Sequence, residues 1–183
     1  MTFKSILVHV DADRRCASRV EYAASLAVRH GAHLVGLFVQ PPLRIPGYVR
    51  AEMGDEVIEQ QRRAEAKVAD NLRAAFESTA KRVTGNGCEF RSGTGDPVAT
   101  LTLHARYADL VVVGQHDHDD DTDTALPNFP ELAAMQAGRP VLVYPYAGKF
   151  DAAPKHVLIS WNASREATRA VTDAIPFLRA AQK

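Results

Sequence analysis

The sequence predicts an α/β protein built on a doubly wound parallel sheet. Short apolar runs alternate with longer segments of helical periodicity along most of the chain. Alternation of this kind requires parallel crossover connections, which place helices on both faces of the sheet. In addition, the opening segment 4–27 recurs, without gaps, at 155–178. The sequence therefore indicates one complete α/β domain followed by the first strand and helix of a second copy.

The expected strands are short apolar runs bounded by polar residues or by glycine and proline. In chain order they are 6–10, 34–39, 88–91, 109–114 and 139–144. The segment 109–114 (DLVVVG) is the clearest of them. An uninterrupted apolar run of this length is typical of a strand that is buried on both faces of a parallel sheet.

The expected helices carry apolar residues three or four positions apart. The first follows Arg14 and ends at Gly31, and its predicted inner face consists of Val20, Ala23, Ala24, Ala27 and Val28. After a predicted loop over 43–50, a long helix has an inner face of Val57, Gln61, Ala64, Val68, Leu72, Ala75 and Phe76. Asp96 and Pro97 have the residue types of a cap and a first helical position. A short helix around 130–137 ends at Gly138.

Composition excludes several classes of protein. The 183 residues include 22 basic and 22 acidic side chains, so the balance of charge gives no support to nucleic acid as a partner. No apolar run reaches the roughly 20 residues that a membrane span needs, and the first residues lack the pattern of a secretion signal. Cys16 and Cys88 are far apart and form no CxxC motif. We therefore expect a cytoplasmic protein with two free thiols and no membrane partner.

The repeated segment defines the expected domain boundaries. Six aligned pairs are identical, namely Lys4/Lys155, Leu7/Leu158, Ala12/Ala163, Arg14/Arg165, Val20/Val171 and Ala23/Ala174. We expect a first domain over 1–146, a linker over 147–154 and a partial second domain over 155–183. Within the second copy, a strand is expected at 157–161 and an amphipathic helix at 167–178.

These segments, taken in order, resemble the universal stress protein family, and specifically its members with two domains in tandem. The matching segments are ILVHVD at 6–11, GTGDP at 93–97, ADLVVVG at 108–114, RPVLV at 139–143 and ISWNAS at 159–164. The resemblance implies a five-stranded, Rossmann-like α/β domain with a role in the stress response. Many members of this family bind ATP or another adenine nucleotide at the carboxyl ends of the strands.

Carried over by position, the resemblance implies a nucleotide site with four contributors. Asp11 would face the adenosine, Val39 would line the base pocket, and the backbone at Gly114 and Gln115 would begin the phosphate loop. The family's ATP-binding members continue from that first glycine as Gly-x-x-Gly, nine residues, then Gly-Ser or Gly-Thr. This chain has Asp117 at the second glycine position.

The loop that replaces the glycine pattern reads QHDHDDDTDT over 115–124. A carboxylate close to a phosphate repels it by about 1 kcal/mol in water and about 4 kcal/mol near a protein surface. Several carboxylates outweigh a helix-dipole attraction of about 0.3–1 kcal/mol. We therefore expect a binding or regulatory module with no cofactor. The alternative is an ATP- or AMP-binding protein with slow ATPase activity that uses Asp11 and the amides near Gly114.

Other readings of single residues stay open at this stage. Asp11 is either a ligand-facing acid or a turn residue before the first helix. His116 and His118, with the aspartates between and after them, are weak candidates for a metal site, but a solvated acidic loop is the simpler interpretation. We expect no metal and no catalytic residue, with Cys16 and His9 serving in packing.

The second copy also predicts self-association. Segment 157–161 would have open backbone edges, and the helix after it carries an apolar stripe that lacks its own sheet. The segment Val141–Tyr144 is the expected edge strand of the first domain. We expect a homodimer, or another homo-oligomer, formed through this edge and the C-terminal remnant. A fraying C-terminal segment is the alternative.

Overall fold

The computed structural model describes residues 2–41, 47–117, 128–150 and 154–183. The first domain contains β1 (Ser5–Val10), α1 (Cys16–His30), β2 (His33–Gln40), α2 (Gly47–Thr84), β3 (Cys88–Thr94), α3 (Pro97–Ala105), β4 (Leu110–Gly114), α4 (Phe129–Gln136) and β5 (Val141–Tyr144). The C-terminal segment contains α5 (Arg165–Asp173) and α6 (Ile175–Leu178). The five predicted strands are all present, with bounds that differ from the expected ones by a few residues.

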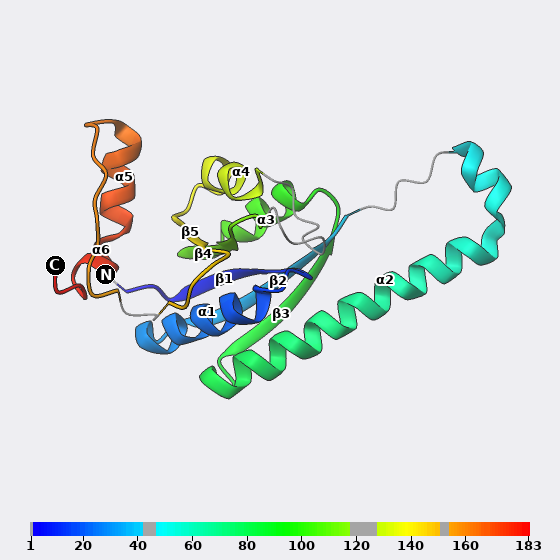
Figure 1. The fold of residues 1–183 in the computed structure, drawn as a ribbon, viewed down its shortest axis with the longest axis horizontal. Helices are drawn as coiled ribbons and strands as arrows, with labels where there is room; N and C mark the ends of the chain where they lie inside the picture. The colour runs from blue at the N-terminus through cyan, green and yellow to red at the C-terminus, as the bar shows by residue number, and fades with distance from the viewer. Residues whose placement is uncertain (1, 42–46, 118–127, 151–153) are drawn as a thin grey trace.

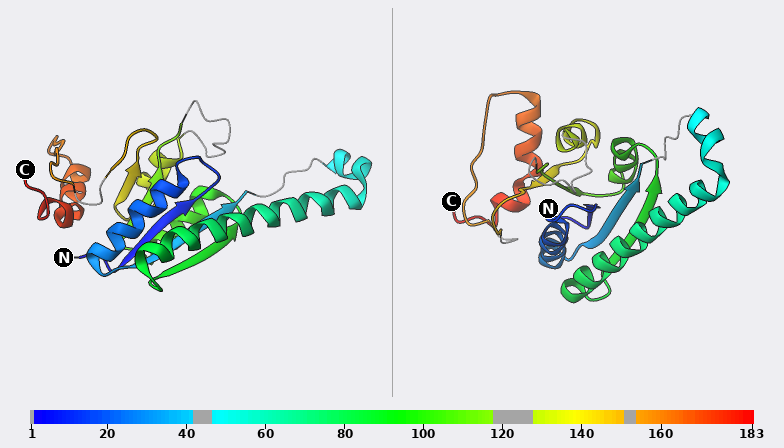
Figure 2. Two further views of the ribbon diagram at one scale, coloured as in Figure 1. Left: turned by 60° about the horizontal axis from the view of Figure 1, so that its bottom comes forward. Right: turned by 45° about the vertical axis from the view of Figure 1, so that its right-hand side comes forward.

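The five strands form one parallel sheet in the order β3-β2-β1-β4-β5. Helices α1 and α2 pack on one face, and α3 and α4 pack on the other (Figure 1, Figure 2). The predicted doubly wound α/β architecture is confirmed. The chain reverses its winding direction between β1 and β4, and this is the position at which such folds usually bind ligands.

Alternate residues of each central strand supply the two halves of the core. On β1, Ile6, Val8 and Val10 belong to the cluster under α1 and α2. Leu7 belongs to the cluster under α3 and α4. Both clusters are almost fully buried, which explains why the strands are continuous apolar runs instead of alternating ones.

The buried face of α1 differs from the predicted one. Val28 was expected inside but is 57% exposed, whereas Leu26 and Arg19 are fully buried. On a helix of 3.6 residues per turn, the buried arc also includes Cys16, and Val28 falls just past its edge. Gly31 ends the helix in the left-handed conformation (φ 61°), as its position predicted.

Helix α2 begins at Gly47, so the loop expected over 43–50 is wrong for residues 47–50. Its C-terminal part packs on the sheet through Phe76, which is 2% exposed. Gly36 on β2 leaves the room for this ring, since a Cβ there would lie 2.5 Å from it.

The predicted inner face of α2 is correct only near its C-terminal end. Val57 and Val68, expected to face the core, are 40% and 46% exposed. Figure 1 shows that the first half of α2, which contains Val57, extends beyond the sheet and has no strand beneath it. Val68 lies in the second half, past Glu65, which is hydrogen-bonded to Gln40 at the end of β2. The spacing of apolar residues along a helix does not indicate where the sheet beneath that helix ends.

The strand expected over 157–161 does not form, and these residues are irregular chain. Leu158, Ile159 and Trp161 are 96%, 48% and 56% exposed. A strand needs a hydrogen-bonding neighbour, and none of the described strands pairs with this segment. The repeat therefore predicted a strand from its local sequence, but the described residues contain no sheet with which that strand could pair.

The helix expected over 167–178 is present as two pieces, α5 and α6, which meet at Ala174. Pro176 explains the break, because proline lacks an N–H and disfavours a helical conformation in the residue before it. Phe177 of α6 packs against Phe3 and His30, at ring distances of 5.5 and 6.3 Å. The C-terminal segment thus contacts the first domain at the amino end of the sheet.

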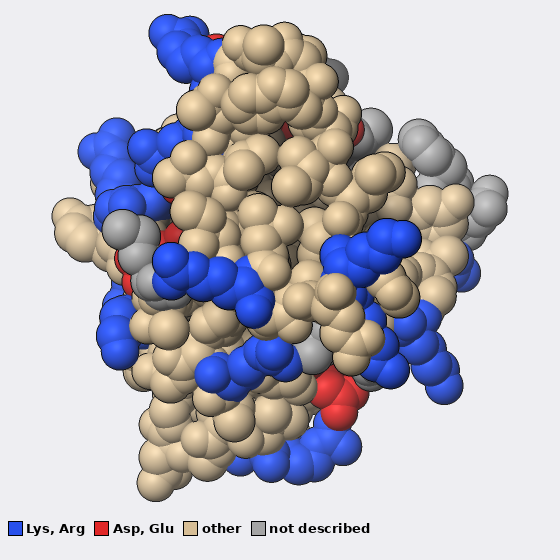
Figure 3. All heavy atoms as spheres, turned by 90° about the vertical axis from the view of Figure 1, so that its left-hand side faces the viewer, with Lys and Arg blue, Asp and Glu red and all other residues tan. Residues whose placement is uncertain are grey.

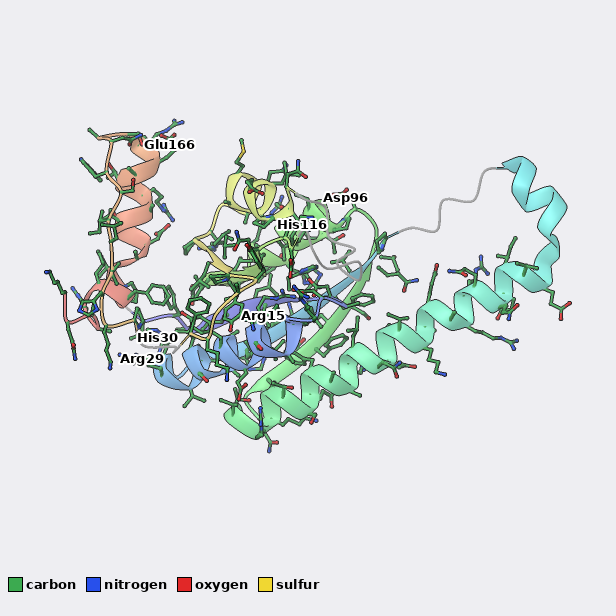
Figure 4. All side chains as sticks on the ribbon, viewed as in Figure 1. Arg15, Arg29, His30, Asp96, His116 and Glu166 are labelled. Carbon is green, nitrogen blue, oxygen red and sulfur yellow. The ribbon has the colours of Figure 1, made fainter. Side chains whose placement is uncertain are left out.

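Basic side chains gather at that end of the molecule. Figure 3 shows Lys and Arg side chains spread over it, with few acidic side chains between them. Arg29 and His30 lie in the last turn of α1 there, where cations interact favourably with the helix dipole (Figure 4). Among the described residues, no helix has the length and apolarity to cross a lipid bilayer.

Candidate functional site at the carboxyl ends of the strands

The fold brings together three of the residues predicted for a nucleotide site. Asp11 follows β1, Val39 lies near the end of β2, and Gly114 ends β4. These three strands are neighbours, so their carboxyl ends meet at one edge of the sheet. Asp11, Val39 and Gly114 therefore lie at the edge of the sheet where the resemblance places the nucleotide crevice.

The carboxyl end of β1 is held by a buried arginine, Arg19, that was not predicted as a site residue. The Arg19 side chain is 1% exposed, and its Nη2 donates to Asp11 Oδ1 at 2.6 Å. Its Nη1 donates to Asp13 Oδ2 at 3.0 Å, and its Nε donates to the carbonyl oxygen of His9 at 3.1 Å. Arg19 thus connects the end of β1 to the loop before α1.

A histidine completes this network from the sheet. His9 Nδ1 lies 3.1 Å from Asp11 Oδ2, and the His9 ring packs at 4.6 Å against the ring of Phe129 on α4. His9 is 6% exposed, in agreement with the predicted packing role. Both carboxylate oxygens of Asp11 therefore already have partners within the chain.

The network shifts the pKa values of its members. Burial alone would raise the pKa of Asp11, but the charge of Arg19 and the hydrogen bond with His9 hold it well below the ordinary 3.8. Burial alone would lower the pKa of Arg19, but Asp11 raises it above its ordinary value. The pair is therefore ionised throughout the physiological range.

Asp11 also has the local role that was considered as an alternative. Its Oδ1 accepts from the backbone N–H of Asp13 at 3.2 Å, and Asp13 Oδ1 accepts from the N–H of Arg15 at 2.8 Å. These two turns bring the chain from β1 into α1. Figure 4 shows Arg15 at the start of this helix.

The backbone at the predicted phosphate loop is closely surrounded. A Cβ placed on Gly114 would overlap Arg19 Nη1 and would lie 3.1 Å from its Cζ. Gly114 is thus a glycine because the guanidinium occupies the space beside it. The N–H of Gln115 donates to the carbonyl oxygen of Tyr144 at 2.9 Å, and the Gln115 side chain is exposed.

Val39, the predicted base-pocket residue, is 4% exposed and belongs to the core under α3 and α4. Its neighbour Gln40 donates from Nε2 to Glu65 Oε2 of α2 at 2.6 Å. Of the four residues predicted to contact a nucleotide, Asp11 and Gly114 lie against Arg19. Val39 packs in the core, and the N–H of Gln115 bonds to Tyr144.

Part of the negative charge of the acidic loop is neutralised by a basic residue from elsewhere in the chain. Asp117 is 2% exposed, and the guanidinium of Arg14 forms an ion pair with its carboxylate. Sequence reasoning counted Asp117 among carboxylates with no basic neighbour in the loop and could not see this long-range partner. The other loop aspartates and His118 lie outside the described residues, and His116 is described.

The described residues contain no group of three or more His, Cys, Asp or Glu side chains arranged to hold a metal ion. Cys16 is buried in the core at the start of α1, in agreement with the predicted packing role.

Three residues of this site were not predicted from the sequence, namely Arg19, Asp13 and Arg14. One signal was available for Arg19, because its position places a charged residue on the apolar face of an Ala-rich helix.

Together, the fold and the Arg19 network define a doubly wound α/β domain whose strand order switches direction between β1 and β4. The Universal stress protein family model matches residues 2–145, which is most of the chain. The chain therefore belongs to the universal stress protein family. Among curated proteins, none matches this chain.

Solved structures with the same fold cover most of the chain at low sequence identity. The universal stress protein UspA from Lactobacillus plantarum has a TM-score of 0.64 and 21% identity, and the match covers 78% of this chain and 98% of that protein. A universal stress protein in complex with cAMP has a TM-score of 0.59 and 21% identity, with coverage of 80% and 100%. The protein from Archaeoglobus fulgidus in complex with dAMP has a TM-score of 0.53 and 18% identity, with coverage of 78% and 98%. These likenesses establish the fold.

Proposed function

We propose that this chain is a cytoplasmic stress-response module that acts through protein contacts and does not bind the phosphates of a nucleotide tightly. The observation that supports this proposal is the engagement of Asp11, whose two carboxylate oxygens are held by Arg19 and His9. A ligand hydroxyl that replaced Arg19 at Asp11 would leave the buried guanidinium with only Asp13 and the carbonyl oxygen of His9 as partners. Separation of a buried ion pair is unfavourable by about 3–5 kcal/mol.

The phosphate side of the crevice supports the same proposal. Phosphate loops bind through free backbone N–H groups that point at the anion. Here the N–H of Gln115 is bonded to Tyr144, and Asp117 stands where the family's nucleotide-binding members have glycine. Arg14 neutralises Asp117 but is itself engaged by it.

One observation favours a second candidate function, the binding of ATP or AMP with slow hydrolysis. Asp11 and Gly114 meet at the switch point of the sheet, and two proteins of the same fold are described in complex with cAMP and dAMP. In this alternative, a nucleotide would exchange the Arg19 contacts for its own and use Arg19 as a cation for a phosphate.

Calorimetry with ATP, AMP and cAMP separates the two functions. We expect no saturable binding with a Kd below about 100 μM, because the contacts that would hold the nucleotide are already made within the chain. The Asp11→Asn variant keeps the shape of the side chain, and the exposed Asp70→Asn variant on α2 is its matched control. Micromolar binding that Asp11→Asn weakens and Asp70→Asn does not would establish the nucleotide-binding alternative.

We further propose that the module is a homodimer formed through β5 and the C-terminal segment. Strand β5 pairs only with β4 among the described strands, and Val143 on it is 41% exposed. Leu158 and Trp161 add exposed apolar surface. An open strand edge next to apolar side chains favours pairing with another chain.

Sedimentation velocity over a range of concentrations tests this association. We expect a dimer that Val143→Glu converts to a monomer, because a buried carboxylate at the interface would lack a partner. Val68→Glu, at a similarly exposed valine on α2, is the control and should leave the dimer intact. A monomeric unmodified chain at about 100 μM, a concentration that reveals even a weak dimer, would refute the proposal.

A further inference from the structure

A second cavity, separate from the crevice, lies between β5, α1 and the chain that follows β5. It has a volume of about 470 Å³. This volume is within the range of about 300–1,000 Å³ that is common for small-molecule sites. Its lining residues do not include Arg19 or any of the four residues predicted to contact a nucleotide, which are Asp11, Val39, Gly114 and Gln115.

Aromatic rings form one wall of this cavity. Tyr144 of β5 packs against Tyr22 of α1 at 5.4 Å and against Phe150 at 5.6 Å, the second pair in an edge-to-face arrangement. Tyr144 is 4% exposed, whereas Phe150 is 45% exposed and offers its ring to a ligand. Edge-to-face and offset contacts of this kind are how aromatic ligands are held in proteins.

The other side of the cavity is basic. Lys149, Lys155 and His156 line it, and among the described residues that line it there is no Asp or Glu. Neither lysine has an ion-pair partner within the described part of the chain. Tyr22 contributes a hydroxyl, which is a hydrogen-bond donor at neutral pH, and burial, together with the neighbouring Tyr144, raises its pKa further.

The wall that follows β5 is fixed by Arg15 at the start of α1. The Arg15 guanidinium donates through Nη2 to the carbonyl oxygen of Gly148 and lies 5.6 Å from the centre of the Tyr144 ring. Gly148 has a φ of 91°, and a Cβ on it would lie 2.9 Å from the Phe150 ring. The turn is therefore shaped so that Phe150 folds back toward Tyr144.

We propose that this cavity binds small aromatic carboxylates. The ring would pack against Phe150 and Tyr22, and the carboxylate would accept hydrogen bonds from Lys149 and Lys155. A neutral aromatic molecule would use only the first set of contacts, and a small inorganic anion only the second. The class of ligand follows from the presence of both sets in one cavity. This inference goes beyond the proposed function and does not depend on the crevice.

Titration calorimetry with 4-hydroxybenzoate tests the proposal, with 4-hydroxybenzyl alcohol as the neutral analogue. We expect saturable binding of the acid and a Kd for the alcohol that is at least about tenfold higher, because hydrogen bonds to charged groups are lost. The double variant Lys149→Met/Lys155→Met should weaken binding of the acid by about tenfold or more and leave the alcohol unaffected. The cavity shares Leu142, Val143 and Tyr144 of β5, and Lys155 and His156 of the C-terminal segment, with the proposed dimer interface, so binding is measured at several protein concentrations.

The matched control is Arg62→Met/Lys67→Met, which removes the same charge from exposed positions on α2. It should bind the acid as the unmodified chain does. Gly148→Ala tests the shape of the site and should weaken the acid and the alcohol alike, because it displaces the Phe150 ring. Equal affinity for acid and alcohol, an equal loss in the control, or no saturable binding would overturn the proposal.

Discussion

Arg19 and Gly114 lie against each other across the switch point of the sheet, so closely that any side chain on the glycine would overlap the guanidinium. One residue comes from α1 and the other from the end of β4. The space that a phosphate loop would use is thus partly filled by a side chain of the protein itself. This contact connects the stability of the domain to the proposed loss of nucleotide binding.

Substitution Gly114→Ala should lower the free energy of unfolding by about 1–3 kcal/mol, the usual effect of overpacking in a close-packed site. The added Cβ meets a guanidinium that is fixed by three hydrogen bonds and has no room to move aside. Urea unfolding measures the loss. Gly87→Ala is the control, because its Cβ would lie 3.5 Å from the nearest atom, and it should change stability by less than about 1 kcal/mol.

Arg19→Met should destabilise the domain by about 3–5 kcal/mol, because it leaves two mostly buried carboxylates without their cation. The surface variant Arg82→Met, which breaks the exposed pair with Glu21, should cost about 0–1 kcal/mol. Chemical denaturation of both variants gives the comparison. Similar losses in the two variants would contradict the assignment of Arg19 as the centre of the network.

Stability should fall in acid through the titration of Asp11. Its pKa in the folded state lies below the ordinary 3.8, so its contribution is fully present above that value and is lost as the pH falls below it. Urea unfolding between about pH 6 and about pH 3 should show this slope. Asp11→Asn should flatten the slope, and exposed Asp70→Asn should preserve it. An unchanged slope in Asp11→Asn would be inconsistent with the ion pair.

The two thiols should react at different rates. Burial raises the pKa of Cys16 to about 11, and the residue is 8% exposed, whereas Cys88 at the start of β3 is half-buried. Since the thiolate is the reactive form, a thiol reagent at neutral pH should label Cys88 first and Cys16 only on unfolding. Mass spectrometry of the labelled peptides identifies the site. Early labelling of Cys16 would show that α1 opens at its start.

Much of the fold was predictable because its signals are local. The segment 109–114 could only be a strand buried on both faces, and Gly31 and Asp96 marked a helix end and a helix start that the structure contains. The local sequence pattern gave a wrong prediction where an adjacent element of the fold decides the structure or the burial of a segment. Segment 157–161 has the composition of a strand but no described strand beside it, and Val57 has helical spacing but no sheet beneath it.

The candidate site shows the same division. The resemblance placed Asp11 and Gly114 together at the carboxyl ends of the strands, and the observed strand order puts β1 and β4 side by side. The pairing of Arg14 with Asp117 was not foreseen, since more than a hundred residues separate them.

By itself the sequence determined the family, the winding of the sheet and the position of the crevice, because strand and helix periods and glycine positions are properties of short segments. Only the tertiary structure decided what fills that crevice. A guanidinium on α1 reaches Asp11, Asp13 and Gly114 at once only after the helix has packed on the sheet, and burial then makes each of those contacts strong.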